Sequence, residues 1–156
     1  MNNHVERIIK QKTPFKTPAL KAEIGIYLMA NNLTNQKQQL FKQYGITHQQ
    51  YNLLRILRGQ YPKVANINLI KERMLDRMSD VSRIVDRLVK MEMVTKEPNL
   101  IDKRNADIVI TEEAIQILAS IEQHPEFSQT IVKNLNEDEI DQLNELIDKM
   151  VSTLDY

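Results

Sequence analysis

Cysteine is absent from this chain of 156 residues, which excludes disulfides, thiolate catalysis and cysteine-ligated metal sites. Long hydrophobic runs are absent too. No stretch approaches the roughly 20 apolar residues that a membrane span requires, and the first residues do not resemble a signal peptide. The three histidines, His4, His48 and His124, lie far apart without the spacing of metal ligands. We therefore expect a cytoplasmic protein with no membrane partner, no metal and no cofactor.

Catalytic motifs are also missing. The sequence contains no nucleophile paired with a base, no glycine-rich phosphate loop and no cluster of metal ligands. These absences argue against an enzyme. The length suffices for one compact domain with a real core but not comfortably for two, so we expect a single domain over residues 1–156.

The charges cancel in total but not along the chain. The 21 basic and 21 acidic residues argue at first against a nucleic-acid-binding protein, because such domains are usually basic. However, residues 1–60 carry nine Lys and Arg against two acids, a net of +7, and residues 112–156 carry two against eleven, a net of −9. Residues 71–104 carry nine against seven, a net of +2. The net charge therefore does not tell whether the protein binds nucleic acid, and the positions of the individual charges have to be considered instead.

Only three glycines and five prolines occur, so each indicates where an element ends. A helix over residues 19–44 is expected between Pro18 and Gly45. Thr47 and Gln50 have the spacing of a capping box and predict a second helix over residues 47–57, ended by Gly59 and Pro62. The apolar spacing predicts two further helices, over residues 66–74 and 79–91.

The last third of the chain is expected to be helical again. Thr111 is placed to cap one helix that stops before Pro125, and Asn136 to cap another that reaches residue 154. Apolar residues of this last helix recur at steps of three and four, as in a coiled-coil seam: Ile140, Leu143, Ile147, Met150 and Leu154.

The segment 79–91 has the most regular pattern in the chain. An apolar stripe of Val81, Ile84, Val85, Leu88 and Met91 must be buried. Small and charged side chains occupy the opposite face: Ser79, Ser82, Arg83, Asp86, Arg87 and Lys90. The candidate DNA contacts of this segment are Ser79, Asp80, Ser82, Arg83 and Arg87. A solvated face is the other interpretation. Arg87 and Lys90 could equally pair with Asp86, and Asp80 could cap the helix.

Two short β-branched runs, residues 93–95 and 108–111, follow this helix and flank a loop with Asp102, Lys103 and Arg104. An isolated hairpin is marginal, so it must pack against the helices. Three short helices followed by a hairpin have the order of a winged helix-turn-helix. In that unit the third helix lies in the major groove of DNA.

The run "VSRIVDRLVKMEMVTKEPNLIDKRNADIVITEEA" resembles the signature of the MarR family of regulators, and the resemblance extends from about Leu20 to Leu154. It implies a mainly α fold: a winged helix-turn-helix lobe over residues 47–111 with a small β-hairpin wing. Helices from both termini, over residues 19–44 and 112–154, would form the dimerisation region. The protein would be a homodimer that binds a pseudo-palindrome in double-stranded DNA, acts as a repressor, and is released by a small-molecule effector.

Individual residues can be matched to the family pattern. Arg104 matches the wing arginine that enters the minor groove, and Asp102 matches the acid that orients it. The helix residues matching positions that face bases are Ser79, Asp80, Ser82 and Arg83. Candidates for an effector pocket, which are core residues by default, are Tyr27, Met29, Phe41 and Tyr51.

Two positions depart from the family pattern. Glu92, or a neighbour, replaces a glycine between the helix and the wing, where a left-handed backbone is less comfortable, and Ala114 replaces a later glycine. The modest charge of residues 71–104 also leaves an alternative open, a winged-helix module that binds protein and not DNA.

Overall fold

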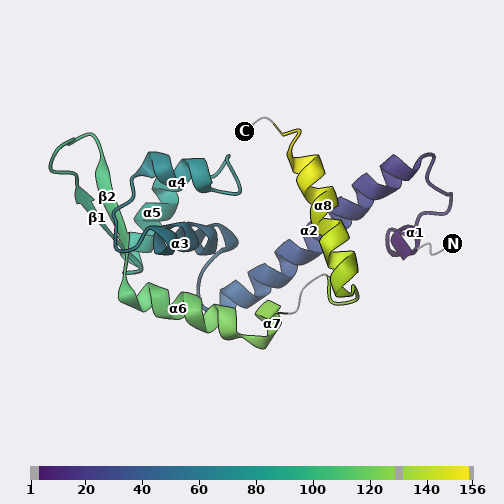
Figure 1. Cartoon of the computed structure of the whole chain (residues 1–156). Helices are drawn as coiled ribbons and strands as arrows, with labels where there is room; N and C mark the ends of the chain where they lie inside the picture. The colour runs from purple at the N-terminus through teal and green to yellow at the C-terminus, as the bar shows by residue number, and fades with distance from the viewer. Residues whose placement is uncertain (1–3, 129–131, 155–156) are drawn as a thin grey trace. The chain divides into compact units, whose positions relative to one another are not determined.

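The computed structural model describes residues 4–128 and 132–154 (Figure 1). The chain divides into two compact units. We call residues 34–128 the winged unit, and residues 1–33 with 129–156 the terminal unit. Within the described residues, no helix has both the length and the apolar character to cross a membrane.

The predicted elements occur in the predicted order, and two short helices over residues 4–8 and 125–128 were not predicted. Helices α1 (His4–Ile8) and α2 (Pro18–Gln43) come first, then α3 (His48–Gln60), α4 (Ile67–Arg73) and α5 (Val81–Lys90). Strands β1 (Val94–Pro98) and β2 (Ala106–Ile110) form the hairpin, and α6 (Glu112–Gln123), α7 (Pro125–Ser128) and α8 (Glu137–Val151) complete the chain. The mainly helical fold with a β-hairpin wing is therefore confirmed.

Helix α3 begins as predicted but ends later. The Thr47 hydroxyl accepts a hydrogen bond from the Gln50 amide at 3.2 Å, and the Gln50 side chain accepts one from the Thr47 amide at 2.8 Å, which completes the capping box. The prediction that Gly59 ends the helix is wrong, because α3 continues to Gln60. A glycine costs a helix only about 1 kcal/mol, and the buried leucines of α3 hold it in place. Pro62 sets the actual limit.

Helix α5 begins two residues later than predicted. Asp80 is its N-cap, and the Asp80 carboxylate accepts a hydrogen bond from the Arg83 amide at 3.1 Å. Ser79 and Asp80 therefore precede the helix and are not part of it. Val81, Val85 and Leu88 are buried and Ile84 is half-buried, as predicted. The prediction is wrong for Met91, which follows the last residue of α5 and is 37% exposed.

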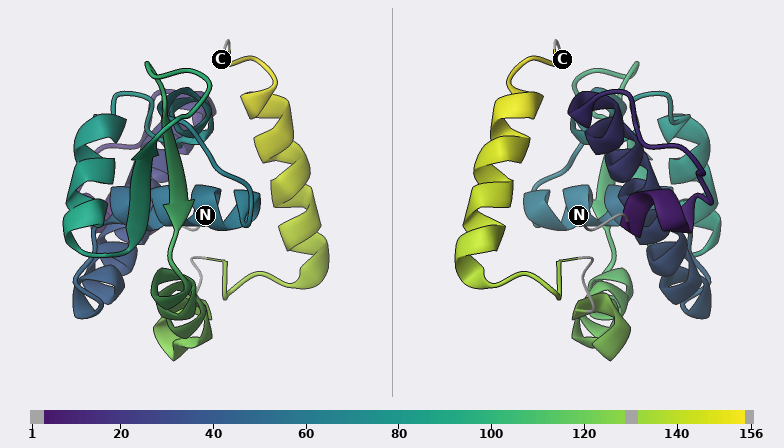
Figure 2. Two further views of the ribbon diagram at one scale, coloured as in Figure 1. Left: turned by 90° about the vertical axis from the view of Figure 1, so that its left-hand side faces the viewer. Right: turned by 90° about the vertical axis from the view of Figure 1, so that its right-hand side faces the viewer.

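The hairpin is longer than predicted and does not stand alone. Its antiparallel register runs from Val94 opposite Ile110 to Pro98 opposite Ala106. Ala65, just before α4, exchanges two backbone hydrogen bonds with Ile108, at 2.9 and 2.8 Å. Ile108 is fully buried. This third segment supplies the support that an isolated hairpin requires, and Figure 2 shows the two strands beside the helices of the winged unit.

Every buried hydrophobic residue of the described part belongs to the winged unit, from Leu40 to Ile121. Helix α6 contributes Ala114, Leu118 and Ile121, and so it packs with the winged unit, whereas the sequence grouped it with the terminal helices. Thr111 caps it as predicted. The small side chain of Ala114 is fully buried.

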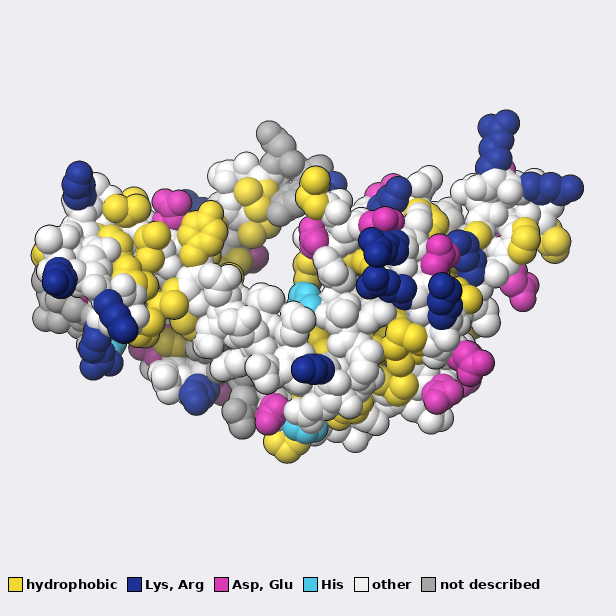
Figure 3. Space-filling view, turned by 180° about the vertical axis from the view of Figure 1, so that it is seen from behind, with side chains coloured by type: hydrophobic (Ala, Val, Ile, Leu, Met, Phe, Trp, Pro, Cys, Tyr) yellow, Lys and Arg dark blue, Asp and Glu magenta, His cyan; other side chains and the backbone are white. Residues whose placement is uncertain are grey.

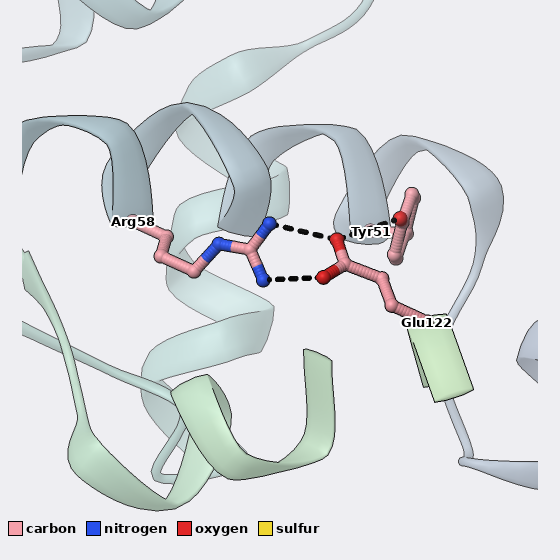
Figure 4. A network of polar contacts seen from close by, with 3 residues as sticks. All are labelled: Tyr51, Arg58 and Glu122. Atoms are coloured by element: carbon pink, nitrogen blue, oxygen red, sulfur yellow. Dashed lines mark hydrogen bonds and ion pairs between the residues drawn. The ribbon is translucent and has the colours of Figure 1, made fainter. Parts of the chain in front are cut away.

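An ion pair fastens α6 to α3. Two nitrogens of Arg58 donate to the two carboxylate oxygens of Glu122, at 2.9 and 2.7 Å, and the Tyr51 hydroxyl lies 3.5 Å from the same carboxylate (Figure 4). The hydrogen bond from Arg58 holds the pKa of Glu122 below its ordinary value of 4.5. A bidentate pair of this kind fixes the relative position of two helices better than a single contact does.

The terminal unit consists of α1, the first part of α2, and α8. Asn136 caps α8, as predicted, and Glu139 completes a capping box with it. The helix ends at Val151, so the prediction that it includes Leu154 is wrong. Residues of α2 and α8 line an apolar groove of about 730 Å³, which includes Ile26, Met29, Leu143 and Ile147.

Candidate nucleic-acid interface

Helix α5 presents a polar face away from the core of the winged unit. Ser82, Arg83, Asp86, Arg87 and Lys90 are exposed, while the apolar stripe of the same helix is buried. The alternation follows the helical repeat, so burying one face necessarily exposes the other. The helix therefore offers two arginines within its first two turns to an external partner.

The turn that leads into α5 is organised by Asp76. Its carboxylate accepts hydrogen bonds from the Ser79 hydroxyl at 2.8 Å, from the Gln49 side chain of α3 at 3.1 Å, and from the Met78 amide at 3.0 Å. The contact with Ser79, followed by those with Gln49 and Met78, lowers the pKa of Asp76 from its ordinary value of 3.8. Asp76 thus fixes the start of α5 relative to α3, and it places Ser79.

Asp86 connects α5 to the wing. The Lys96 ammonium of β1 donates to the Asp86 carboxylate at 2.8 Å. This contact settles one open question from the sequence, because Asp86 pairs with Lys96 and not with Arg87 or Lys90. The pair is largely exposed, so its contribution to stability is at most about 1 kcal/mol.

The loop of the wing is held by its own side chains. The Asp102 carboxylate accepts hydrogen bonds from the Arg104 amide at 3.0 Å and from the Asn105 side chain at 2.8 Å. The Asn99 side-chain oxygen accepts from the amides of Ile101 and Asp102, at 2.9 and 2.7 Å. Asp102 therefore positions Arg104 through its backbone, and not through its guanidinium group.

The acidic and basic side chains of this surface have different surroundings. Asp76, Asp80, Asp86 and Asp102 all accept hydrogen bonds from the protein itself. In residues 4–128 and 132–154, no hydrogen bond or ion pair engages the charged groups of five basic side chains: Arg83, Arg87, Lys90, Lys103 and Arg104. Figure 3 shows Lys and Arg side chains gathered on one face of the winged unit, with Asp and Glu among them. A nearly neutral segment can thus present accessible positive charge.

The predicted effector residues are not gathered in one pocket of either unit. Phe41 and Tyr51 are buried in the winged unit, with their rings stacked at 4.2 Å between centroids. In the terminal unit, Met29 lines the apolar groove, while Tyr27 is 63% exposed. Phe41 and Tyr51 thus have the core role that was their default interpretation.

Sequence reasoning missed Asp76 and Asn99, which organise the two loops. The signal for Asp76 was available, because an aspartate three residues before a serine often accepts hydrogen bonds from the turn that follows it. The bond from Gln49 joins residues 27 positions apart, and local patterns do not predict such pairs.

Comparisons with known proteins agree with this geometry. The model of the MarR family matches residues 46–106, which span α3, α4, α5, β1 and the loop of the wing. The HTH-type transcriptional regulator MgrA of Staphylococcus aureus is 25% identical over 122 residues, 75% of this chain and 78% of that protein.

Solved structures share the fold. A variant of MarR from E. coli, complexed with operator DNA, has a TM-score of 0.75 at 21% identity and covers 89% of this chain and 99% of that one. The MepR–DNA complex of S. aureus has a TM-score of 0.73 at 23% identity and covers 90% and 100%. The order of the elements, the signature carried by α5 and the wing, and these matches lead to one conclusion: the chain has a winged helix-turn-helix fold, and its residues 46–106 match the MarR family of transcriptional regulators.

Proposed function

We propose that this protein is a sequence-specific regulator that binds a pseudo-palindromic DNA site as a homodimer, with repression as its output. One observation carries the proposal. On the surface formed by α5 and the wing, the four aspartates described above accept hydrogen bonds from protein donors, while Arg83, Arg87 and Arg104 have guanidinium groups without a partner in the described residues. Phosphates and base edges are the partners that such groups recognise.

Each element has a distinct task in this proposal. Helix α5 enters the major groove, where Ser82 and Arg83 face base edges, and Arg87 lies further along the same exposed face. Arg104 enters the minor groove, whose concentrated negative potential attracts a guanidinium group. Lys103 contacts phosphate. Asp80 and Ser79 keep α5 and its preceding turn in position.

The second copy is proposed to cover the apolar surface of the terminal unit. Exposed apolar side chains of α8 continue the groove between α2 and α8, and Leu146, Ile147, Met150 and Val151 are 41–59% exposed. A second chain that buries them would account for an otherwise unfavourable surface. A two-fold dimer would place its half-sites about 10 base pairs apart.

Titration into duplex DNA at two salt concentrations tests the proposal. Phosphate contacts release counterions, so the affinity should fall steeply as salt rises. A winged-helix module that binds only protein is the alternative, favoured by the net charge of +2 over residues 71–104. It predicts weak binding with little salt dependence, and that result would reject DNA recognition.

Selection from a random pool of duplexes tests base readout. Arg83→Ala should alter the selected sequence, because a contact to a base edge carries sequence information and a contact to phosphate does not. Lys133→Ala is the matched control, since it removes one exposed positive charge from the terminal unit. If both variants return the parent sequence, Arg83 does not read bases.

Repression and effector release complete the proposal, together with a cytoplasmic location beside the DNA. The match to the MarR family supports an effector, and Tyr27 and Met29 remain the better candidates for contacting it, because Phe41 and Tyr51 already fill the core of the winged unit. In vitro transcription from a template with the selected site should fall when the protein is added. A compound found by thermal-shift screening should restore it.

A further inference from the structure

Four large hydrophobic side chains are more exposed than any others described by the structure. They are Leu75 at 76%, Met78 at 93%, Leu100 at 94% and Ile101 at 97%. The first two lie in the turn before α5, and the last two lie in the wing loop. Single exposed hydrophobic residues are common on protein surfaces. These four side chains, in contrast, are clustered in two loops beside the proposed DNA interface.

The wing loop holds its apolar pair in place. The Asn99 side-chain oxygen binds the amides of Ile101 and Asp102, and its nitrogen donates to Asp107 of β2 at 2.8 Å. The Asn99 amide donates to the carbonyl of Asn105 at 3.0 Å, which closes the loop at its base. The loop therefore keeps Leu100 and Ile101 at its tip without a large loss of loop entropy on binding.

Charged and apolar groups share this small loop. Lys103 and Arg104 line a hollow with Ile67 and Asn68 of α4, whereas Ile101 lines a different hollow. All these loop residues fall within residues 99–105, between the two strands. The apolar pair and Arg104 thus lie within five consecutive residues of one loop, close enough to contact one groove of DNA.

We propose that Leu100 and Ile101 form an apolar wedge that enters the minor groove with Arg104 and packs against the deoxyribose walls. The inference rests on the proposed DNA binding and adds a contact of a different physical kind. Leucine and isoleucine serve as minor-groove wedges in other architectures, where they deform the duplex. Because such a contact neutralises no phosphate, it strengthens binding without adding to the salt dependence.

A pair of variants separates the wedge from the charges. The probe is the duplex that the unchanged protein selects from a random pool. The double variant Leu100→Ser, Ile101→Ser should bind it about tenfold more weakly or worse, with the slope of log affinity against log salt unchanged. Lys103→Gln is the matched control on the same loop, and it should reduce that slope by about 0.9.

The selected sequence gives a second readout. The base preference at the flanks of the site, where the wing contacts the duplex, should weaken in the double variant, because deformation is sequence-dependent. The base preference at the positions that α5 contacts should not change. Thermal unfolding should not change, since both side chains are almost fully exposed. If the double variant does not fold, Ile101→Ser alone replaces it.

The outcomes distinguish this inference from the proposed function. Parental affinity in the double variant overturns the wedge and leaves the tip to a protein partner, while DNA binding stands. A loss of affinity accompanied by a smaller salt slope also overturns it, because the charges would then have been displaced. Failure of the unchanged protein to bind any duplex would reject both proposals together.

Discussion

The two units of this chain use their hydrophobic residues differently. In the winged unit, α3, α5, α6 and the hairpin bury a continuous core, with side chains such as Leu53, Leu88 and Leu118 fully inaccessible. In the terminal unit, neither α1 nor α8 has a buried residue, and the buried residues of α2 lie in its part of the winged unit. Among the described residues, the winged unit thus has a buried core within a single chain, and the helices of the terminal unit have none.

This difference indicates how the protein divides its tasks. A self-contained core can hold α5 and the wing at fixed positions, which readout of base edges requires. An apolar surface without a core gains stability only when another surface covers it. We therefore expect the winged unit to set DNA recognition, and the terminal unit to make the fold depend on protein concentration.

The largest effect should follow from charges placed in the seam of α8. Leu143→Asp combined with Ile147→Asp should abolish the dimer and specific DNA binding, because two carboxylates would have to be buried at the interface. The winged unit should remain folded, as both positions lie outside it. Sedimentation should report a monomer, and circular dichroism should report retained helix.

A matched variant adds the same two charges to the same helix at exposed positions between the seam residues. Gln142→Asp with Asn144→Asp should leave the dimer intact. If the seam variant sediments as a folded dimer, the interface lies elsewhere.

Exposed ion pairs between the +7 and −9 segments contribute only about 0 to 1 kcal/mol each. High salt should therefore loosen the dimer modestly and not dissolve it.

A second contrast compares one leucine from each unit. Leu118→Ala, in the core of the winged unit, should lower the free energy of unfolding by about 2–5 kcal/mol at every protein concentration. Leu146→Ala, on exposed α8, should have an effect that depends on protein concentration. Chemical denaturation at two concentrations measures both. Equal behaviour of the two variants would contradict the division between the units.

The wing should affect binding without affecting stability. Arg104→Ala should weaken binding to the selected site by roughly 1–3 kcal/mol, because the guanidinium group enters a groove of concentrated negative potential. Asp102→Asn should cause an intermediate loss, since Asp102 positions the Arg104 amide. Lys103→Ala should cost less. Fluorescence titration measures all three, and unchanged affinity of Arg104→Ala would remove the wing from the interface.

Local signals in the sequence predict the starts of α3, α6 and α8, whereas α5 begins two residues later than predicted. The capping boxes at Thr47 and Asn136 and the cap at Thr111 are side-chain contacts over three residues, so the order of residues contains them. Helix ends depend on tertiary packing as well as on local signals. Gly59 was a plausible stop, but burial of the α3 leucines outweighs the weak propensity of one glycine.

The candidate site could be predicted only in part. The polar face of α5 and the Asp102–Arg104 spacing are periodic or local, and both were visible. The hydrogen bond of Gln49 to Asp76 and the pairing of Lys96 with Asp86 depend on how elements pack. The exposure of Leu100 and Ile101 also follows from the loop conformation, since the same residues in a sequence could equally belong to a core.

The pair between α3 and α6 should make the winged unit sensitive to acid. Because the folded-state pKa of Glu122 lies below 4.5, the pair stabilises the fold above that pH, and the contribution is lost as pH falls through the folded-state pKa. Glu122→Gln should cost about 1 kcal/mol at neutral pH, since both partners are about one-third exposed, and little in acid. Glu126→Gln, at an exposed carboxylate, is the control. If the loss of unfolding free energy caused by Glu122→Gln becomes larger as the pH falls, this assignment is wrong.

The smallest predicted effect comes from two helix ends with the same geometry. At the end of α2, Gly45 has φ of 71°, and the amide of the next residue donates to the carbonyl of Phe41 at 3.1 Å. At the end of α5, Glu92 has φ of 57°, and the amide of the next residue donates to the carbonyl of Leu88 at 3.0 Å. Both are Schellman ends, whose left-handed position favours glycine. The departure noted at Glu92 therefore leaves the geometry intact.

Glu92→Gly should raise the free energy of unfolding by about 0.5–1 kcal/mol, because relief of left-handed strain outweighs the extra entropy of glycine in the unfolded chain. Gly45→Ala should lower it by a similar amount. Glu92→Ala is the control for the charge, since it removes the carboxylate but keeps a β-carbon, and it should leave stability nearly unchanged. Denaturant titration ranks the three variants. If Glu92→Ala stabilises the protein as much as Glu92→Gly does, the left-handed backbone is not the cause of the strain. The negative charge of the Glu92 carboxylate would then be the unfavourable feature of this helix end.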